Sequence, residues 1–176
     1  MEEIKNILSI IESKFHGESS GLDPSVSLFN SPIFYSNKQI KLIDKIHYKN
    51  FTIYIMDSKI NSSTKKMIEV FQSKMNESEF RYFFDNKYII NTNECIKYLL
   101  NGSNLFKDSL KQLSENTLNN FSEMIPNQLI NIWENGLKSD SYYMKLCGSG
   151  GGGFFLLFDF NDQINSGLSD FNLYQI

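Results

Sequence analysis

The chain has 176 residues, of which 41% are apolar and 21% are charged, so it can build a sizeable core and global disorder is excluded. Seventeen basic against 20 acidic residues give a net charge of −3, which argues against a general nucleic-acid-binding protein. No apolar run approaches the roughly 20 residues needed to cross a bilayer, and the Met-Glu-Glu start does not resemble a signal peptide. We therefore expect a cytoplasmic protein that binds neither nucleic acid nor membranes.

The first third of the chain is predicted to contain a helix, a loop and several short strands. Residues 2–16 carry apolar side chains at helical spacing, and Gly17 is expected to end that helix. Residues 17–24 are rich in Gly and Ser and are predicted to form a loop. The pattern then predicts short extended segments at 26–29, 33–35 and 40–43, and a buried strand at 51–56.

The rest of the chain alternates between helical and extended patterns. A helix is predicted at 64–75, with Ser62 or Ser63 as its N-cap. Further helices are expected at 93–101, 106–118 and 128–137, and strands at 142–147 and 154–160. This order predicts an α+β fold in which helices lie on one face of an antiparallel sheet.

The run G-S-G-G-G-G at 148–153 is the most informative segment, because it lies between two strongly apolar stretches. Glycine lets backbone N–H groups point into one concavity and lets other groups approach closely, which is a geometry that binds phosphate. The G-x-x-x-x-G-K-[ST] pattern is absent, however, and a flexible hairpin loop would have the same composition. The segment by itself leaves both interpretations open.

The segment E-S-K-F-H-G-E-S-S-G-L-D at 12–23 places two carboxylates around a Gly/Ser loop. Glu12 and His16 are four residues apart and share one helix face, and Asp23 follows the loop that begins at the end of that helix. Such a pair can supply a metal ligand and a general base. A surface glutamate and an aspartate held by turn hydrogen bonds explain the same residues, and the residues alone favour that second interpretation.

Together, the two segments resemble the GHMP kinase superfamily, and within it the mevalonate kinases. H-G-E-S-S-G-L-D at 16–23 is similar to the H-G-x-P-S-G-[IV]-D loop of mevalonate kinases, and K-L-C-G-S-G-G-G-G at 145–153 is similar to their K-L-T-G-A-G-G-G-G loop. Cys147 and Ser149 also resemble a bacterial group of GYDIA-type GHMP kinases. The resemblance extends from Ile4 to about Phe160 and implies a ferredoxin-like C-terminal domain that uses ATP and Mg²⁺.

The resemblance implies a role for each matching residue. Asp23 matches the catalytic base that acts on the substrate hydroxyl, Glu12 matches the glutamate that ligates the Mg²⁺ of MgATP, and Thr64 matches a threonine on the substrate side. The other positions implied to line the substrate are His16, Gly17, Ser20 and Gly21. The positions implied to lie against the ATP phosphates are Gly148, Ser149, Gly150, Gly151, Gly152 and Gly153.

The resemblance covers only the C-terminal part of such a kinase. The P-x-x-x-G-L-G-S-S-A loop that dominates the family's nucleotide site does not occur in the sequence, nor does the early strand with the family's catalytic lysine. We therefore expect residues 1–45 to be a remnant of the N-terminal domain and residues 46–176 to be the C-terminal domain. The missing half, on the same or a separate chain, is the expected partner, and without it the chain should bind ATP poorly.

Substrate choice is less constrained. Ser19 stands where mevalonate kinases usually have Pro, and Pro24 follows the aspartate where they usually have Asn or Ala. The leading hypothesis is phosphorylation of a hydroxyl of mevalonate or a similar small hydroxy acid in isoprenoid precursor synthesis. Two alternatives stay open: a non-catalytic remnant or partner module of a split kinase, and a phosphomevalonate kinase-like enzyme. The sequence also leaves open whether the chain forms a homodimer.

Overall fold

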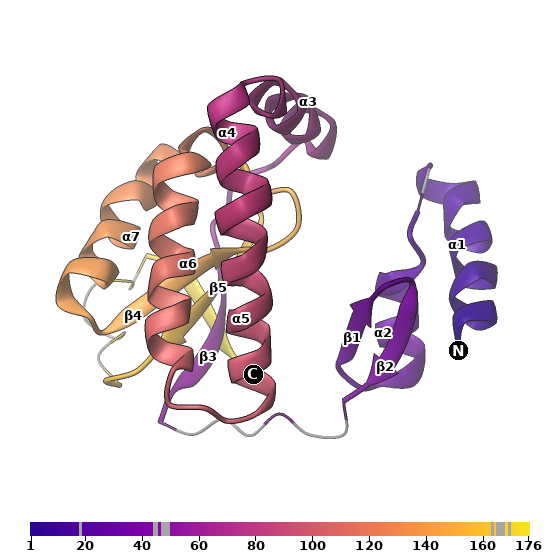
Figure 1. The fold of residues 1–176 in the computed structure, drawn as a ribbon, viewed down its shortest axis with the longest axis horizontal. Coiled ribbons are helices and arrows are strands. Elements are labelled where there is room, and N and C mark those ends of the chain that lie inside the picture. The colour runs from indigo at the N-terminus through magenta and orange to yellow at the C-terminus, as the bar shows by residue number, and fades with distance from the viewer. Residues whose placement is uncertain (18, 44–45, 47–49, 163, 165–167, 169) are drawn as a thin grey trace. The chain divides into compact units, whose positions relative to one another are not determined.

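In the computed structural model the chain forms two compact units, which we call the N-terminal unit (Met1–Ile46) and the C-terminal unit (His47–Ile176). The structure describes residues 1–17, 19–43, 46, 50–162, 164, 168 and 170–176 (Figure 1). The predicted domain boundary after residue 45 falls in a stretch where 44–45 and 47–49 lie outside the described residues. No helix in the described ranges is long and apolar enough to span a membrane.

The N-terminal unit consists of two helices and a β-hairpin. Helix α1 (Glu2–His16) has the predicted bounds and ends at Gly17. Strands β1 (Ile33–Ser36) and β2 (Gln39–Leu42) pair antiparallel, close to the predicted extended segments.

Helix α2 (Leu22–Phe29) corrects two predictions, since residues 26–29 are helical rather than extended and the predicted loop ends at Gly21. Gly21 adopts a left-handed conformation at the N-cap. Pro24 falls in the first turn of α2, where its missing N–H costs no helical hydrogen bond.

The C-terminal unit is built on a four-stranded antiparallel sheet with the order β4-β5-β3-β6. Its strands are β3 (Thr52–Asp57), β4 (Tyr142–Leu146), β5 (Phe154–Asp159) and β6 (Asn172–Gln175). Three of them match predicted strands, whereas the sequence did not predict β6. The α+β fold with an antiparallel sheet and packed helices is confirmed.

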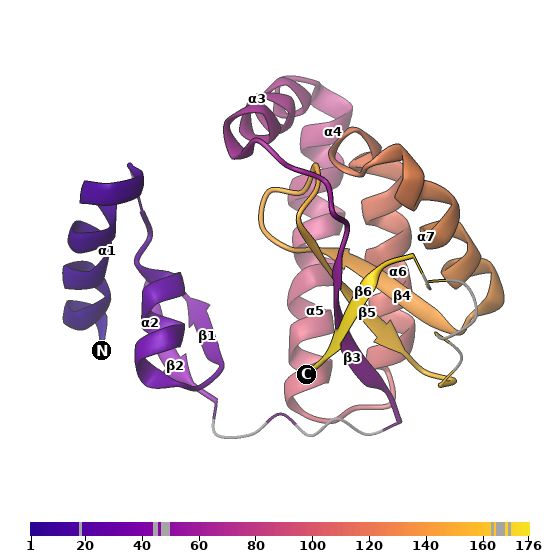
Figure 2. The same cartoon turned by 180° about the vertical axis from the view of Figure 1, so that it is seen from behind.

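Seven helical segments accompany this sheet in the described residues. They are α3 (Thr64–Met75), α4 (Ser78–Phe83), the π-helical turn η1 (Phe84–Tyr88), α5 (Ile89–Leu100), α6 (Phe106–Asn120), the 3-10 turn η2 (Ser122–Met124) and α7 (Asn127–Ser139). Helices α5 and α6 lie in front of the sheet in Figure 1 and behind it in Figure 2, so they cover one face.

The sheet carries apolar side chains on both faces. Tyr143 packs with residues of α6, whereas its neighbour Met144 packs with residues of α7, and successive residues of a strand point to opposite faces. The α6-side cluster comprises Ile53, Cys95, Phe106, Leu110, Leu113, Tyr143 and Phe158. The α7-side cluster comprises Met56, Ile125, Leu129, Trp133, Met144, Phe155, Leu157, Ile164 and Leu168. Helix α7 therefore packs on the side of the sheet opposite to α6, next to β4, so the prediction that the helices lie on one face holds for α5 and α6 but not for α7.

Candidate functional site

The loop after α1 is held by a chain of side-chain hydrogen bonds. The Ser19 hydroxyl donates to the Glu12 carboxylate and accepts the N–H of Gly21 at 3.0 Å. The Ser9 hydroxyl donates to the Ser19 carbonyl at 2.6 Å, and the Ser13 hydroxyl accepts the Ser19 N–H at 3.1 Å. Ser19, which departs from the mevalonate kinase pattern, is thus the residue that ties this loop to α1.

Gly21 is required where α2 starts against α1. A Cβ at this position would collide with the carbonyl oxygen of Lys5 and lie 2.8 Å from the Ser9 nitrogen, and its φ of +74° also disfavours other residues. The Ser25 hydroxyl, which is fully buried, donates to the Gly21 carbonyl at 2.5 Å. The resemblance implies that Gly21 lines the substrate. The close contacts with α1 also require glycine at this position for a structural reason.

The sequence predicted that Asp23 lies in a loop. In the structure it lies in the first turn of α2. The helix fixes the backbone from which this carboxylate projects, and a general base must be held within hydrogen-bond reach of the proton that it accepts. The first-turn position is compatible with the role of base that the resemblance implies.

The predicted magnesium ligand has a hydrogen-bond partner from the loop. Glu12 accepts the Ser19 hydroxyl, and the described residues contain no cluster of three or more His, Cys, Asp or Glu side chains that could hold a metal ion. Mg²⁺ bound with a nucleotide usually takes only one or two protein carboxylates and completes its shell with phosphates and water. A single glutamate fits that donor set, whereas a metal held by the protein alone does not.

The remaining predicted residues of this segment lie beside Glu12 and Asp23 in the chain. Gly17 follows α1 with a φ of +85°, and a Cβ there would meet nothing within 4 Å. The Ser20 hydroxyl accepts the Leu22 N–H at 3.3 Å. His16 is the last residue of α1, and its side chain lies outside the described part of the structure.

The glycine run forms the connection between β4 and β5, and its backbone packs tightly on other segments. The Gly151 N–H donates to the Met124 carbonyl at 2.6 Å, and the Gly153 N–H donates to the Ile60 carbonyl at 2.8 Å. The Ser62 hydroxyl donates to the Gly150 carbonyl at 2.5 Å. The loop is therefore ordered by its own protein contacts and is not the flexible hairpin that composition alone allowed.

Three of these glycines cannot carry a side chain without displacing other atoms. A Cβ on Gly150 would lie 2.7 Å from the Met124 oxygen, on Gly151 2.6 Å from the Met67 sulfur, and on Gly152 2.5 Å from the Ile60 oxygen. Gly148 and Gly153, by contrast, have open space around an added Cβ. Close backbone approach thus accounts for the centre of the run.

The run keeps some capacity to bind an anion. Within the described residues, no hydrogen bond uses the N–H groups of Gly148, Ser149 or Gly152. Positive φ values at Gly148 and Gly152 turn the backbone in ways that let such groups converge on a ligand. Gly152 is buried, so the segment combines a structural core with two amide groups, those of Gly148 and Ser149, that lie outside it.

The glycine run lies beside the start of α3. Ser62 and Met67 are the residues that Gly151 approaches, and Thr64 is the first residue of α3 between them. The Ser63 hydroxyl accepts the Lys66 N–H, which confirms Ser63 as the N-cap. The structure thus places the predicted substrate-side Thr64 and the predicted phosphate-side loop in one region of the C-terminal unit.

The predicted site residues fall into two groups, one in each unit. Glu12, His16, Gly17, Ser20, Gly21 and Asp23 belong to the N-terminal unit, and Thr64 and residues 148–153 belong to the C-terminal unit. Within each group the residues are neighbours. That the two groups meet around one substrate stays a prediction.

Cys147, directly before the run, does not have the properties of a nucleophile. Burial raises the pKa of its thiol, an effect that Lys145 only partly offsets. Burial also raises the pKa of Cys95, to about 11. Both thiols are free and are neutral at pH 7.

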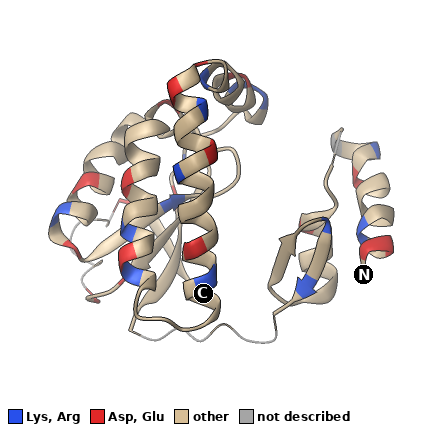
Figure 3. Cartoon of the chain, viewed as in Figure 1, with Lys and Arg blue, Asp and Glu red and all other residues tan. Residues whose placement is uncertain are grey.

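A charged network that the sequence did not predict joins α6 to the end of α7. Asp140 accepts Lys107 at 2.8 Å, Lys111 at 2.7 Å and the Tyr143 hydroxyl at 2.5 Å. The Lys107 and Lys111 ammonium groups and the Tyr143 hydroxyl hold the pKa of Asp140 well below its usual range. Burial, with Asp140 as the next cause, raises the pKa of Tyr143. Positive and negative residues alternate along α6 (Figure 3).

Comparison with known proteins shows the fold but not the family. No protein-family model and no curated protein sequence matches the chain. The crystal structure of L. major mevalonate kinase in complex with R-mevalonate superposes with a TM-score of 0.73 at 18% sequence identity, and the match covers 100% of this chain and 58% of that one. The chain therefore has a fold similar to that of this mevalonate kinase and spans about 58% of its length.

Proposed function

We propose that this chain is the C-terminal part of an ATP-dependent small-molecule kinase that phosphorylates a hydroxyl of mevalonate or a similar hydroxy acid. The observation that carries the proposal is the superposition of the whole chain on a mevalonate kinase. The order of the two loop motifs along the sequence is a second observation that supports the proposal.

In this proposal each loop contributes what phosphoryl transfer requires. Asp23, in the first turn of α2, orients the substrate hydroxyl and accepts its proton. The amide groups of Gly148 and Ser149 face the charge that spreads over the transferred phosphoryl oxygens. Glu12 would hold the Mg²⁺ of MgATP, which supplies charge neutralisation on the phosphates.

The proposal also requires a partner. The neighbouring kinase is longer than this chain, and we propose that a kinase N-terminal half supplies the principal phosphate-binding loop. That half lies on the same polypeptide or on a separate one. Its loop would bind the nucleotide at a helix N-terminus, which is the strongest type of backbone anion site.

The direct test is reconstitution. The chain is mixed with a co-expressed kinase N-terminal half that carries a G-L-G-S-S-A loop, and MgATP-dependent phosphorylation is followed by mass spectrometry over a panel of hydroxy acids that includes mevalonate and phosphomevalonate. Asp23→Asn should lower kcat by about 10²–10⁴-fold, the usual contribution of a general base. Asp85→Asn, an exposed aspartate in η1, is the control and should leave kcat unchanged. Equal turnover of the Asp23 variant and the unchanged chain would refute the assignment of Asp23.

One observation favours a second candidate, a non-catalytic remnant or partner module. The contacts of Gly150, Gly151 and Gly152 with Met124, Met67 and Ile60 account for the glycines without any ligand. A remnant would keep these folding contacts and show no phosphorylation with any substrate of the panel, even when it forms a stable complex with the N-terminal half. Selective turnover of phosphomevalonate would instead assign a phosphomevalonate kinase-like activity.

A further inference from the structure

A cavity in the C-terminal unit lies at the other end of the sheet from the glycine run. It has a volume of about 350 Å³, within the range of small-molecule sites. Its walls come from the start of β3, the turn between α5 and α6, and Phe160 directly after β5. Strand β5 begins at the glycine run and ends at the cavity, which separates the two by about 20 Å at the rise of an extended strand.

Aromatic side chains form the apolar part of this cavity. The ring of Phe51 lies 5.0 Å from that of Phe106 and 5.5 Å from that of Phe160, between ring centroids. Phe106 is buried, and Leu99 adds an aliphatic wall. A flat apolar ring would find contacts here like those that aromatic pairs make in protein cores.

The walls are fixed by hydrogen bonds before any ligand arrives. The turn after α5 has the Schellman pattern, in which Gly102 at φ +61° donates to the Leu99 carbonyl and Ser103 donates to the Tyr98 carbonyl. The Phe106 N–H donates to the Ser103 carbonyl at 3.1 Å, and the Phe160 N–H donates to the Ser141 carbonyl at 2.9 Å. A cavity with such walls loses little conformational entropy when it binds a ligand.

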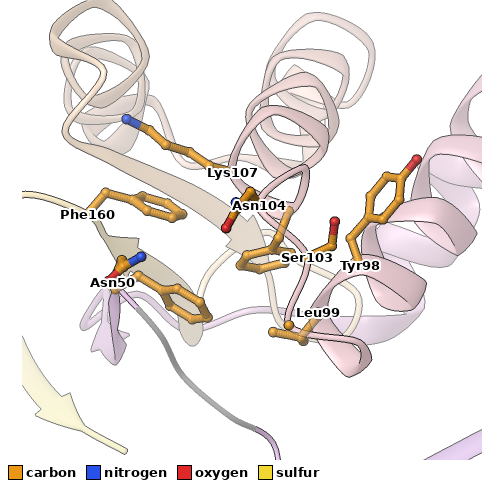
Figure 4. A pocket seen from close by; sticks show the side chains of 10 residues that line it. Asn50, Tyr98, Leu99, Ser103, Asn104, Lys107 and Phe160 are labelled. Carbon is orange, nitrogen blue, oxygen red and sulfur yellow. The ribbon is translucent and has the colours of Figure 1, made fainter.

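A lysine in the cavity wall favours a ligand with a negative charge. Lys107 is the one charged residue among the described residues that line it, and its ammonium lies 5.4 Å from the centroid of the Phe160 ring, above which the side chain runs in Figure 4. The Lys107 ammonium also pairs with Asp140 at 2.8 Å, outside the residues that line the cavity. No carboxylate is among the described residues that line the cavity, so a ligand carboxylate meets an ammonium group there and no like charge, and the amides of Asn50 and Asn104 add hydrogen-bonding capacity.

From these contacts we propose that the cavity binds a small aromatic carboxylate, with its ring on the phenylalanines and its carboxylate towards Lys107. Within the C-terminal unit the site is separate from the glycine run, and the inference does not depend on the proposed function. The proposed ligand is therefore additional to the substrate and nucleotide of the proposed kinase.

The test uses the full chain and 2-naphthoate as the probe, with neutral 2-naphthamide and cationic 2-naphthylmethylammonium as matched compounds. Binding is measured by isothermal titration calorimetry and ligand-observed NMR. Naphthoate should bind most tightly and the ammonium compound most weakly. Lys107→Met should weaken naphthoate about fivefold, the scale of a partly exposed ion pair, and leave naphthamide within twofold. Lys138→Met, which removes an exposed lysine that pairs with Glu134 and does not line the cavity, should change neither.

A second variant separates this cavity from other apolar surfaces. Asn104→Trp, at an exposed turn position, should fill the cavity and abolish binding of both naphthoate and naphthamide, while circular dichroism shows an unchanged fold. Naphthoate binding that survives Asn104→Trp would place the probe elsewhere and overturn the proposal. Equal affinities for the three compounds, or no binding at millimolar concentration, would overturn it as well.

Discussion

At the residue scale, the centre of the glycine run shows how composition and contact are linked. Gly152 has a φ of +151°, and an added Cβ would lie 2.5 Å from the Ile60 oxygen. The next residue, Gly153, donates to that same oxygen at 2.8 Å. Moving Ile60 away would therefore break a backbone hydrogen bond, so relieving the collision would itself destabilise the fold.

Gly152→Ala should accordingly lower the free energy of unfolding by about 3 kcal/mol, since it adds a steric collision to an unfavourable backbone conformation. Gly148→Ala is the matched control, because its φ is also positive but an added Cβ meets nothing within 4 Å. We expect it to cost about 1 kcal/mol. Urea unfolding of both variants measures the difference, and equal losses would contradict the contact with Ile60.

The sequence predicted that the glycine run allows close approach but not what approaches it. Its partners, Ile60, Met67 and Met124, come from segments far away in the chain, and no local pattern marks them. The partner of Glu12, Ser19, is only seven residues away in the chain, but the sequence marked it only as a departure from a motif. Ser63 was predictable because an N-cap acts on a backbone group three residues away.

At the scale of elements, Asp140 joins the beginning of α6 to the end of α7. The ammonium groups of Lys107 and Lys111 and the hydroxyl of Tyr143 keep the pKa of this carboxyl well below its unfolded value of about 3.9. A depressed folded pKa means that the carboxylate stabilises the fold above the unfolded pKa. That stabilisation is lost as the pH falls from about 4 through the lower folded pKa.

Asp140→Asn should therefore destabilise the chain by about 1 kcal/mol at pH 7, a modest value because the Asp140 side chain is 49% exposed. The difference from the unchanged chain should shrink as the pH is lowered below about 4. Asparagine tolerates the left-handed conformation of Asp140 at the end of α7, so the helix terminus itself is preserved. Asp108→Asn on α6 serves as the control, and a difference that stays constant between pH 7 and pH 3 would rule out the ionic origin.

Prediction of the elements failed where distant contacts decide the structure. The aromatic segment around 80–84 lacked a helical prediction, yet it forms α4 and η1 because Phe80 and Phe84 pack against Phe71 and Phe121. Arg81 lies in α4, and its Nε donates to the Met75 carbonyl at the end of α3. Strand β6 is polar and only four residues long, and its pairing with Tyr54–Asp57 defines it.

At the scale of the whole molecule, the N-terminal unit leaves much apolar surface exposed. Helix α1 exposes Ile7 at 57% and Phe15 at 76%, on the stripe whose helical spacing predicted the helix. A unit of this size buries little core by itself. Large exposed apolar patches mark interfaces with a partner, or association where that partner is absent.

The isolated chain should therefore self-associate at micromolar concentration, and Ile7→Gln combined with Phe15→Gln should reduce that association. Ile90→Gln, which changes a similarly exposed isoleucine on α5, should leave it unchanged. Light scattering coupled to size-exclusion chromatography distinguishes these outcomes. A monomeric unchanged chain would remove the basis for a partner at this surface.

The pairing of strand β6 affects how the chain folds during its synthesis. Strand β3 lies in the interior of the sheet only because residues 172–175 pair along its outer side, and the Ile176 N–H adds a bond to the Ile53 carbonyl at 3.1 Å. While a ribosome is still adding the preceding residues, that side of β3 offers unpaired backbone groups to any neighbouring nascent chain. Slow translation of the codons for residues 172–175 would then prolong the interval in which the polypeptide is prone to aggregate.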